Sequence, residues 1–219
     1  MRLQEIQREI VECEKCPRLR EHCRTVAQVK RRAYRDETYW GRPVPSFGDP
    51  KARLVIVGLA PGAHGANRTG RVFTGDRSGD FLYRALHEAG FANQPSSIHV
   101  DDGLTLRDAW ITCPVHCAPP DNKPLPEELR TCQTYLEEEL RLLHNKQIVV
   151  VLGRIALDAY LSVTGGRKSA YPFGHGAFFP AAHPAILCSY HPSQQNTQTG
   201  RLTQAMLTGV FQQARAALR

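Results

Sequence analysis

The sequence predicts an α/β protein with three layers, α/β/α, in which helices cover both faces of a central, mostly parallel four-stranded sheet. Short apolar, β-branched runs alternate with amphipathic helical stretches, a pattern typical of such sheets. No internal repeat, low-complexity tail or clear linker interrupts this alternation, and 219 residues suit a single domain over 1–219. Polar loops follow three of the expected strands, and loops of that kind meet at one edge of a parallel sheet.

The first half of the chain begins with an amphipathic helix over 1–16, which we expect Pro17 to stop. An irregular, proline-containing stretch precedes a buried strand over 53–59. A glycine-rich loop then leads into a helix over 77–89, and residues 98–100 are weak strand material.

The second half alternates more regularly. A strand over 109–115 leads through a proline-rich loop to a helix over 125–143, whose acidic first turn suits the positive end of a helix dipole. The remaining elements are an apolar strand over 147–152, a helix over 154–163, a strand over 185–190 and a helix from about 200 to 217.

The chain carries 28 Lys and Arg against 21 Asp and Glu, a net charge of +7 that favours an anionic partner, nucleic acid first. Seven basic residues between Arg18 and Arg35, followed by Tyr39 and Trp40, suit either a nucleic-acid backbone or an ordinary solvated helix face. No segment approaches the roughly 20 apolar residues of a membrane span, and the first residues lack the apolar core of a signal peptide. We therefore expect a cytoplasmic, nucleoid-associated protein with no membrane partner.

Seven cysteines in a reducing compartment need an explanation other than disulfides. Cys13 and Cys16 form a CxxC pair, and fourteen residues separate Cys117 from Cys132. Four thiolates suit zinc or an iron–sulfur cluster, and the lack of a second CxxC favours the cluster. The alternative is that these are small buried apolar side chains, and Cys23 competes as a ligand because it follows Cys16 closely.

The loop after the first buried strand is the richest in candidate site residues. It holds five glycines between Gly62 and Gly79, mixed with histidine, asparagine, arginine, threonine and aspartate side chains. Glycine permits close backbone approach, and a polar loop at this end of a strand is where an open α/β sheet binds its ligand. The alternative is a long surface loop without function, which is uncommon at this length.

Four motifs make the chain resemble the uracil-DNA glycosylase superfamily, and most closely its iron–sulfur-containing family 5, or type b. They are GLAPGAHGANRTGR at 58–71, FTGDRSG at 73–79, CAPPDNKP at 117–124 and HPSQQN at 191–196. The resemblance implies a parallel sheet with flanking helices. It also implies a structural [4Fe–4S] cluster on Cys13, Cys16, Cys117 and Cys132, which anchors the N-terminal helix.

Two departures from related branches bear on the chemistry. Related enzymes carry an acidic residue at or near Leu59 and Ala60, whereas both positions are apolar here, so the catalytic carboxylate moves to Asp76 or, as the competitor, Asp80. A related branch has asparagine where this chain has Cys113, and the replacement suggests looser base selection.

The implied reaction is hydrolysis of an N-glycosidic bond after the base has been flipped from the stack. Asp76 supplies the anion and activates water, Asn122 holds the water or the base edge, and His191 donates to the departing base. Substrate-binding positions are Gly58, Ala60, His64, Phe73, Asp80, Cys113 and Asn196. DNA-binding positions, which contact phosphates or neighbouring DNA, are Arg68, Arg71, Arg77, Ser193 and Gln194.

We therefore expect a monofunctional, monomeric DNA glycosylase that releases uracil, and further deaminated or damaged bases such as hypoxanthine, xanthine and ethenocytosine, at the start of base excision repair. Its substrate is double-stranded DNA with a damaged base, and single-stranded DNA is a second candidate. One alternative is a non-catalytic, metal-containing DNA-binding protein, which the apolar Leu59 and Ala60 favour. Another is a redox protein that uses the cluster.

Overall fold

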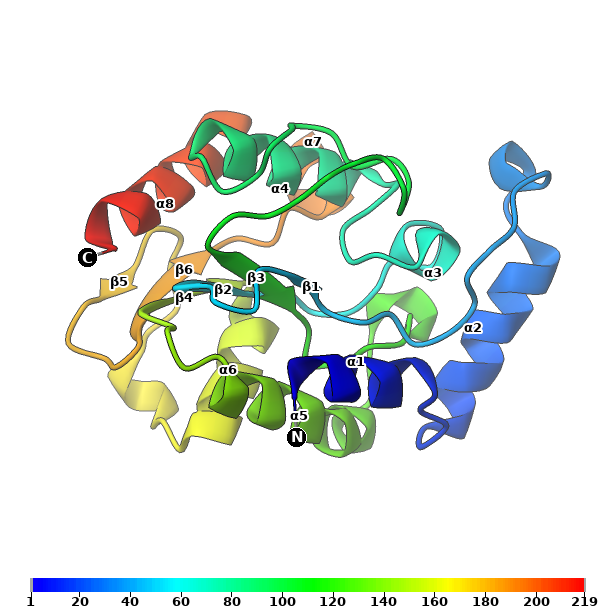
Figure 1. Ribbon diagram of the computed structural model, residues 1–219, viewed down its shortest axis with the longest axis horizontal. Coiled ribbons are helices and arrows are strands. Elements are labelled where there is room, and N and C mark those ends of the chain that lie inside the picture. Colours follow the sequence, from blue (N-terminus) through cyan, green and yellow to red (C-terminus); the bar gives the residue numbers. More distant parts are fainter. Residues whose placement is uncertain (1, 219) are drawn as a thin grey trace.

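A six-stranded sheet lies at the centre of the computed structural model, which describes residues 2–218 (Figure 1). Its order is β1-β3-β2-β4-β6-β5, and the central four strands run parallel while β1 and β5 pair antiparallel at the two edges. The strands are β1 (Phe47–Gly48), β2 (Leu54–Val57), β3 (Ala109–Thr112), β4 (Ile148–Leu152), β5 (Phe178–Phe179) and β6 (Ala185–Ser189). The expected four parallel strands are confirmed, but a sheet of only four strands is wrong, because two edge strands of two residues each complete it.

Helices cover both faces of the sheet, as expected, with α4 and α8 on one side and α1, α5 and α6 on the other (Figure 1). The α-helices are α1 (Leu3–Val11), α2 (Pro17–Val29), α3 (Ala66–Thr69), α4 (Arg77–Glu88), α5 (Pro126–Leu142), α6 (Arg154–Thr164), α7 (Gln194–Gln198) and α8 (Gln204–Ala217). Three short 3₁₀ turns are η1 (Arg32–Tyr34), η2 (Pro120–Asn122) and η3 (Lys168–Ala170). No helix within residues 2–218 is both long and apolar enough to cross a bilayer.

The alternation of side chains along the central strands explains why both faces are covered. Leu54 and Ile56 of β2 pack into the cluster with α4 and α8, whereas Val55 and Val57 pack into the cluster with α5 and α6. All four side chains are buried. A strand that is apolar on both faces is stable only between two helical layers.

The N-terminal region differs from the expected single helix over 1–16. The first helix ends at Val11, the stretch containing Cys13 and Cys16 is not helical, and the expectation that Pro17 stops the first helix is wrong, because Pro17 begins α2. Proline suits the first helical position because its missing N–H has no partner to lose there. Three of the seven basic residues from Arg18 onward therefore lie on α2, and the other four follow its end.

Residues 98–100, expected as weak strand material, form no strand. The Asp102 carboxylate accepts hydrogen bonds from the backbone N–H groups of Ile98, His99 and Leu104, at distances of 2.9, 3.3 and 3.0 Å. These bonds fold the segment into a turn on itself, so its N–H groups are not available to a neighbouring strand.

A buried hydrogen-bond network fastens α1 to the sheet. The Glu139 side chain of α5 is fully buried and accepts from Gln7 of α1 at 2.6 Å and from the Thr112 hydroxyl of β3. Gln7 also accepts from the backbone N–H of Ser46 at 2.6 Å. Because buried polar groups are costly without partners, each of these side chains holds the others in place.

Candidate active site

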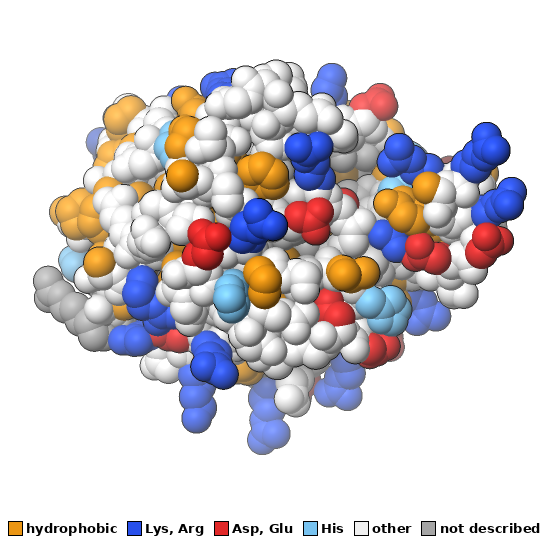
Figure 2. Space-filling view, turned by 90° about the horizontal axis from the view of Figure 1, so that it is seen from above, with side chains coloured by type: hydrophobic (Ala, Val, Ile, Leu, Met, Phe, Trp, Pro, Cys, Tyr) orange, Lys and Arg blue, Asp and Glu red, His pale blue; other side chains and the backbone are white. Residues whose placement is uncertain are grey.

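A cleft of about 730 Å³ opens beyond the carboxyl ends of the central strands. Its walls come from loops that follow β2, β3 and β6, which the sequence places far apart, and from residues just beyond α2. The structure thus brings together the three polar loops of the sequence motifs. Figure 2 shows lysine and arginine side chains dispersed over one face of the molecule, several of them on the lobe at the right that the end of α2 and η1 form.

Asp76 faces this cleft from the N-cap of α4. Its Oδ1 accepts from the backbone N–H of Gly79 at 3.0 Å, while Oδ2 lies against the turn that holds Gly62 and Gly65. A Cβ atom added at Gly62 or Gly65 would lie 2.8 or 1.9 Å from that oxygen, so the packing is tight at Gly62 and requires glycine at Gly65. Burial raises the pKa of Asp76 above its ordinary value. Asp80 is exposed on α4 and does not line the cleft.

An apolar floor forms where Phe73, Cys113 and Gly58 meet. The Phe73 ring is only 8% exposed, and its centroid lies 5.8 Å from that of His191 with the rings tilted by 33°. A Cβ at Gly58 would lie 2.9 Å from the Phe73 ring and 3.0 Å from the Cys113 sulfur, so glycine permits this packing. Burial lowers the pKa of His191 to about 4, which keeps its imidazole neutral near pH 7.

Asn122 lines the cleft from η2, where it and Asp121 have left-handed backbone angles, φ 56° and 53°. Asparagine and aspartate adopt this region more readily than other residues with a side chain. Two consecutive residues of this kind reverse the chain sharply and place the exposed Asn122 on the cleft wall.

The loop after β6 is held by its own side chains. Asn196 donates through Nδ2 to the carbonyl of His191 at 2.8 Å, and Ser193 accepts from the backbone N–H of Asn196 at 3.4 Å as the N-cap of α7. Ser193 and Gln194 line the cleft, whereas Asn196 does not. The structure therefore gives Asn196 a part in holding the loop that carries His191.

Two arginines expected at phosphates are buried within the protein instead. Arg71 is 4% exposed and pairs with Asp102 at 2.7 Å, and it also donates to Ser97 at 3.0 Å. Arg68 is 8% exposed, pairs with Glu37 and donates to the carbonyl of Gly75 at 2.7 Å. Neither guanidinium is presented to DNA, because both are occupied in bracing the glycine-rich loop.

Three other cations border the cleft and have no salt bridge within the described part of the chain: Arg31, Arg77 and Lys123. Of these three, only Arg77 is a phosphate contact that the sequence predicts. Arg31 lies in the basic run and Lys123 lies in the CAPPDNKP motif, but nothing in the sequence distinguishes either of them from its neighbours as a phosphate contact. Leu59 and Ala60 also line the cleft, and the head of the loop offers no acidic side chain.

Four cysteines line a separate, enclosed cavity: Cys13, Cys16, Cys117 and Cys132. No three His, Cys, Asp or Glu side chains between residues 2 and 218 converge closely enough to hold one metal ion. His116 donates through Nδ1 to the carbonyl of Val44 at 2.8 Å. Its buried Nε2 has no partner among the described residues, and the side chain lines the same cavity. Four thiols and an unsatisfied nitrogen around one space fit a group larger than a single ion.

Cys23, the competing ligand, does not line this cavity. It is fully buried, and its sulfur lies 3.6 Å from the carbonyl of Ala118, beside the thiol of Cys117. The geometry thus separates Cys23 from the four cysteines chosen from their spacing.

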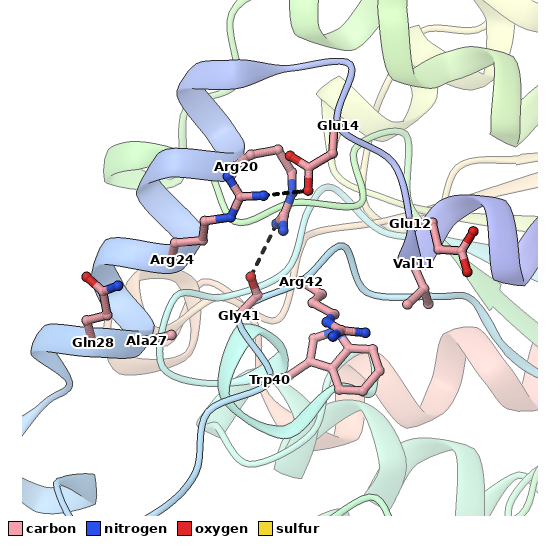
Figure 3. Close-up of a pocket in the computed structure, with 10 residues that line it drawn as sticks. All are labelled: Val11, Glu12, Glu14, Arg20, Arg24, Ala27, Gln28, Trp40, Gly41 and Arg42. Atoms are coloured by element: carbon pink, nitrogen blue, oxygen red, sulfur yellow. Dashed lines mark hydrogen bonds and ion pairs between the residues drawn. The ribbon is translucent and has the colours of Figure 1, made fainter.

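A further cavity of about 590 Å³ lies between α1, α2 and residues 40–42 (Figure 3). Glu14, between the two cysteines of the CxxC pair, contacts Arg20 at 3.4 Å and Arg24 at 2.6 Å. Arg20 donates to the carbonyl of Gly41 at 3.2 Å (Figure 3). The backbone N–H of Gly41 in turn donates to the carbonyl of Asn67 at 3.0 Å. These contacts connect the CxxC turn to the glycine-rich loop of the cleft.

Comparison with known proteins points in one direction. A family model described as the uracil DNA glycosylase superfamily matches residues 45–215. A Thermus thermophilus protein named Type-5 uracil-DNA glycosylase is 55% identical over 204 residues, which cover 93% of this chain and 92% of that protein. Proteins with the same name from Mycobacterium tuberculosis and Pyrobaculum aerophilum are 51% and 46% identical, cover 93% and 94% of this chain, and are themselves covered to 77% and 89%.

Proposed function

The chain belongs to the uracil DNA glycosylase superfamily, and we propose that it hydrolyses the N-glycosidic bond of uracil in DNA as a monofunctional glycosylase that starts base excision repair. The observation that carries this proposal is the meeting of Asp76, Asn122, His191 and Phe73 in one cleft. Three loops far apart in sequence supply these side chains, and each sits at the end of a central strand or directly beyond it.

The reaction places different demands on the two sides of the scissile bond. The sugar becomes positively charged as the bond breaks, and the departing base becomes negatively charged. Asp76 meets the first demand, because Oδ2 is the carboxylate oxygen left free of the N-cap bond and is able to orient and activate a water molecule. The neutral His191 imidazole meets the second by donating an N–H to the base oxygen. Asn122, which also lines the cleft, holds the water or the base edge.

The extruded base rests on the apolar floor. The Phe73 ring provides a stacking surface, and Cys113 lines the cleft beside it without offering an amide. An amide reads the hydrogen-bond pattern of a base edge, whereas a buried thiol is a weak donor and acceptor. We therefore extend the substrates to hypoxanthine, xanthine and ethenocytosine, in double-stranded DNA and, as a second candidate, single-stranded DNA.

We further propose that Cys13, Cys16, Cys117 and Cys132 hold a [4Fe–4S] cluster. When bound, the cluster supplies four iron–thiolate bonds between the CxxC turn, the loop after β3 and α5, and its part is structural. Residues of the chain connect this site to the cleft. Cys117 lies only five positions before Asn122, and the CxxC turn is linked to the carbonyl of Gly41 through Arg20. Equal iron and acid-labile sulfide contents in the purified protein, with no zinc, support this; stoichiometric zinc contradicts it.

We also propose the oligomeric state, location and DNA contacts of the protein. The protein acts as a monomer on damaged DNA in the cytoplasm, associated with the nucleoid. Its phosphate contacts come from Arg31, Arg77 and Lys123, the unpaired cations of the cleft. Affinity for DNA therefore falls steeply as salt rises.

The function is tested with a panel of duplexes that carry uracil, hypoxanthine, xanthine or ethenocytosine at one position. We expect abasic product from the uracil duplex, revealed as strand cleavage only after alkali, because the proposed mechanism attacks the sugar with water activated by Asp76 and forms no Schiff base. Release of no base at all, with DNA binding intact, contradicts the proposal. That result favours a non-catalytic DNA-binding protein, for which the apolar Leu59 and Ala60 speak.

A further inference from the structure

His64 is the one imidazole of the cleft whose two nitrogens are distinguished by the surrounding hydrogen bonds. Its Nδ1 lies 3.0 Å from the hydroxyl of Tyr39, and the two rings meet edge to face. Its backbone carbonyl accepts from Arg68 Nε at 2.9 Å, so the main chain is held as well as the side chain. Tyr39 is 8% exposed, and its hydroxyl lies at the junction of the glycine-rich loop and the segment after α2.

The proton of the Tyr39 hydroxyl decides which nitrogen of His64 is protonated. The hydroxyl oxygen accepts the backbone N–H of Arg31 at 3.4 Å, and His64 Nδ1 is the other polar atom within hydrogen-bond distance of it among residues 2–218. With Nδ1 as acceptor, the hydroxyl uses both its acceptor and its donor capacity, whereas with Nδ1 as donor the hydroxyl proton has no partner among these residues. Nδ1 therefore accepts, and the neutral ring carries its proton on Nε2.

The charge of the ring agrees with this assignment. Burial lowers the pKa of His64, and the positive charges of Arg31, Arg68 and His22 lower it further. His64 is thus a neutral hydrogen-bond donor that lines the cleft. The cationic side chain of Arg31 and the ring of Tyr34 line the cleft as well.

We infer that His64 Nε2–H donates a hydrogen bond to a phosphate oxygen of the bound DNA strand, and that Tyr39 is the positioning residue that fixes this tautomer. The inference rests on the proposed function, since DNA is its ligand. A phosphate is favoured over the base because His64 lies beside the unpaired Arg31, whose backbone N–H meets the same Tyr39 hydroxyl as His64 Nδ1. Neutral donors to phosphate position the strand without adding charge.

The first test separates the two nitrogens with two amide variants. His64→Gln keeps a donor near the Nε2 position, whereas His64→Asn keeps a partner for Tyr39 near Nδ1 but loses the donor. We expect His64→Asn to weaken binding of a uracil duplex about three- to tenfold, with a smaller effect on the single-turnover rate at saturating enzyme, and His64→Gln to restore most of the affinity. Equal affinity of all three proteins overturns the inference.

The second test uses the salt dependence of binding. A neutral donor releases no counterion, so His64→Asn shifts the plot of log affinity against log salt downward without changing its slope. Arg31→Ala, the matched control on the same wall, reduces the slope by about 0.9. A similar loss of slope in His64→Asn shows that the ring binds as a cation and contradicts the neutral tautomer.

Two further measurements identify the tautomer and the atom contacted. In ¹⁵N-histidine spectra of the whole protein, we expect the Nε2–H pattern for His64, lost or mixed in Tyr39→Phe; an Nδ1–H pattern overturns the assignment. Uncharged methylphosphonates, introduced one at a time beside the uracil, should include one position at which His64→Asn costs no further affinity. A penalty that is unchanged at every position but varies with the damaged base instead assigns the contact to the base. Uracil release by the wild-type protein in the same experiments shows whether the proposed function itself holds.

Discussion

Replacing Gly65 with alanine should displace the carboxylate that drives the reaction. The added Cβ would lie 1.9 Å from Asp76 Oδ2 and 2.6 Å from its Cγ, whereas real Cβ contacts essentially never fall below 3.0 Å. The carboxylate or the turn must therefore move by about 1 Å. A displacement of that size at a reacting group costs about 10²-fold in rate. Gly62→Ala is the graded control, because its Cβ would lie 2.8 Å from the same oxygen and needs a shift of only a few tenths of an ångström.

The assay is uracil release in single-turnover reactions with excess enzyme, with DNA binding and thermal unfolding measured alongside. We expect about a 10²-fold fall for Gly65→Ala, a fall of less than about tenfold for Gly62→Ala, and similar DNA affinity for both. In an Asp76→Ala background, Gly65→Ala should cost little more, because no carboxylate remains to be displaced. A rate within about twofold of wild type, or the full loss repeated in that background, refutes the reasoning.

Three further predictions concern stability and pH. Arg71→Ala leaves the Asp102 carboxylate without its ion-pair partner and should lower the free energy of unfolding by about 3 kcal/mol in urea titrations. Burial raises the pKa of Asp102, but the hydrogen bonds from Arg71 and the backbone lower it more, to about 2. The folded protein gains stability from this lowered pKa; the gain is complete above the pKa of the unfolded state and is lost as the pH falls from about 4 to 2. This pH dependence should be missing in Asp102→Asn. Gln7→Ala leaves the buried Glu139 short of a donor, and a loss of about 1–3 kcal/mol in the same titrations is expected; no loss contradicts the role given to this network. The raised pKa of Asp76 should make the rate fall with decreasing pH at a higher pH than an ordinary aspartate allows, and a pH–rate profile flat down to pH 4 contradicts its part as a base.

The order of the central elements was predictable because local pattern and global fold agree along these segments. Strands such as Ile148–Leu152 are apolar on both faces, which only a covered parallel sheet explains. The edge strands were missed because Phe47–Gly48 and Phe178–Phe179 are too short to show a period of their own. α2 was obscured because Pro17 reads equally as the end of one helix and as the first residue of the next.

The candidate site was predictable where glycine and strand ends marked it, and less so where long-range pairing decides a side chain's role. Asp76, Asn122 and His191 line one cleft, as the resemblance implied, and their catalytic roles stay predictions. Arg71 reads in sequence like any loop arginine. Its partner Asp102 lies 31 positions away, and no local pattern announces that the two are buried together.

The same limit hid the arrangement around His64. Nothing in the sequence near Tyr39 indicates that its hydroxyl meets His64, 25 positions later, or that the backbone of Arg31 occupies its other side. Such contacts depend on how α2 leads into the segment beside the glycine-rich loop. These contacts can be identified only in the folded structure.

The measurement that tests the central claim most directly compares wild-type protein with Asp76→Asn on one uracil-containing duplex. Asparagine caps a helix about as well as aspartate, so the bond to the Gly79 N–H and the fold are retained while the base is removed. We predict a fall of about 10²- to 10⁴-fold in the single-turnover rate of uracil release, with DNA affinity within about threefold of wild type. Uracil release at the wild-type rate, or equal losses in rate and in binding, contradicts the assignment of Asp76 as the residue that activates water.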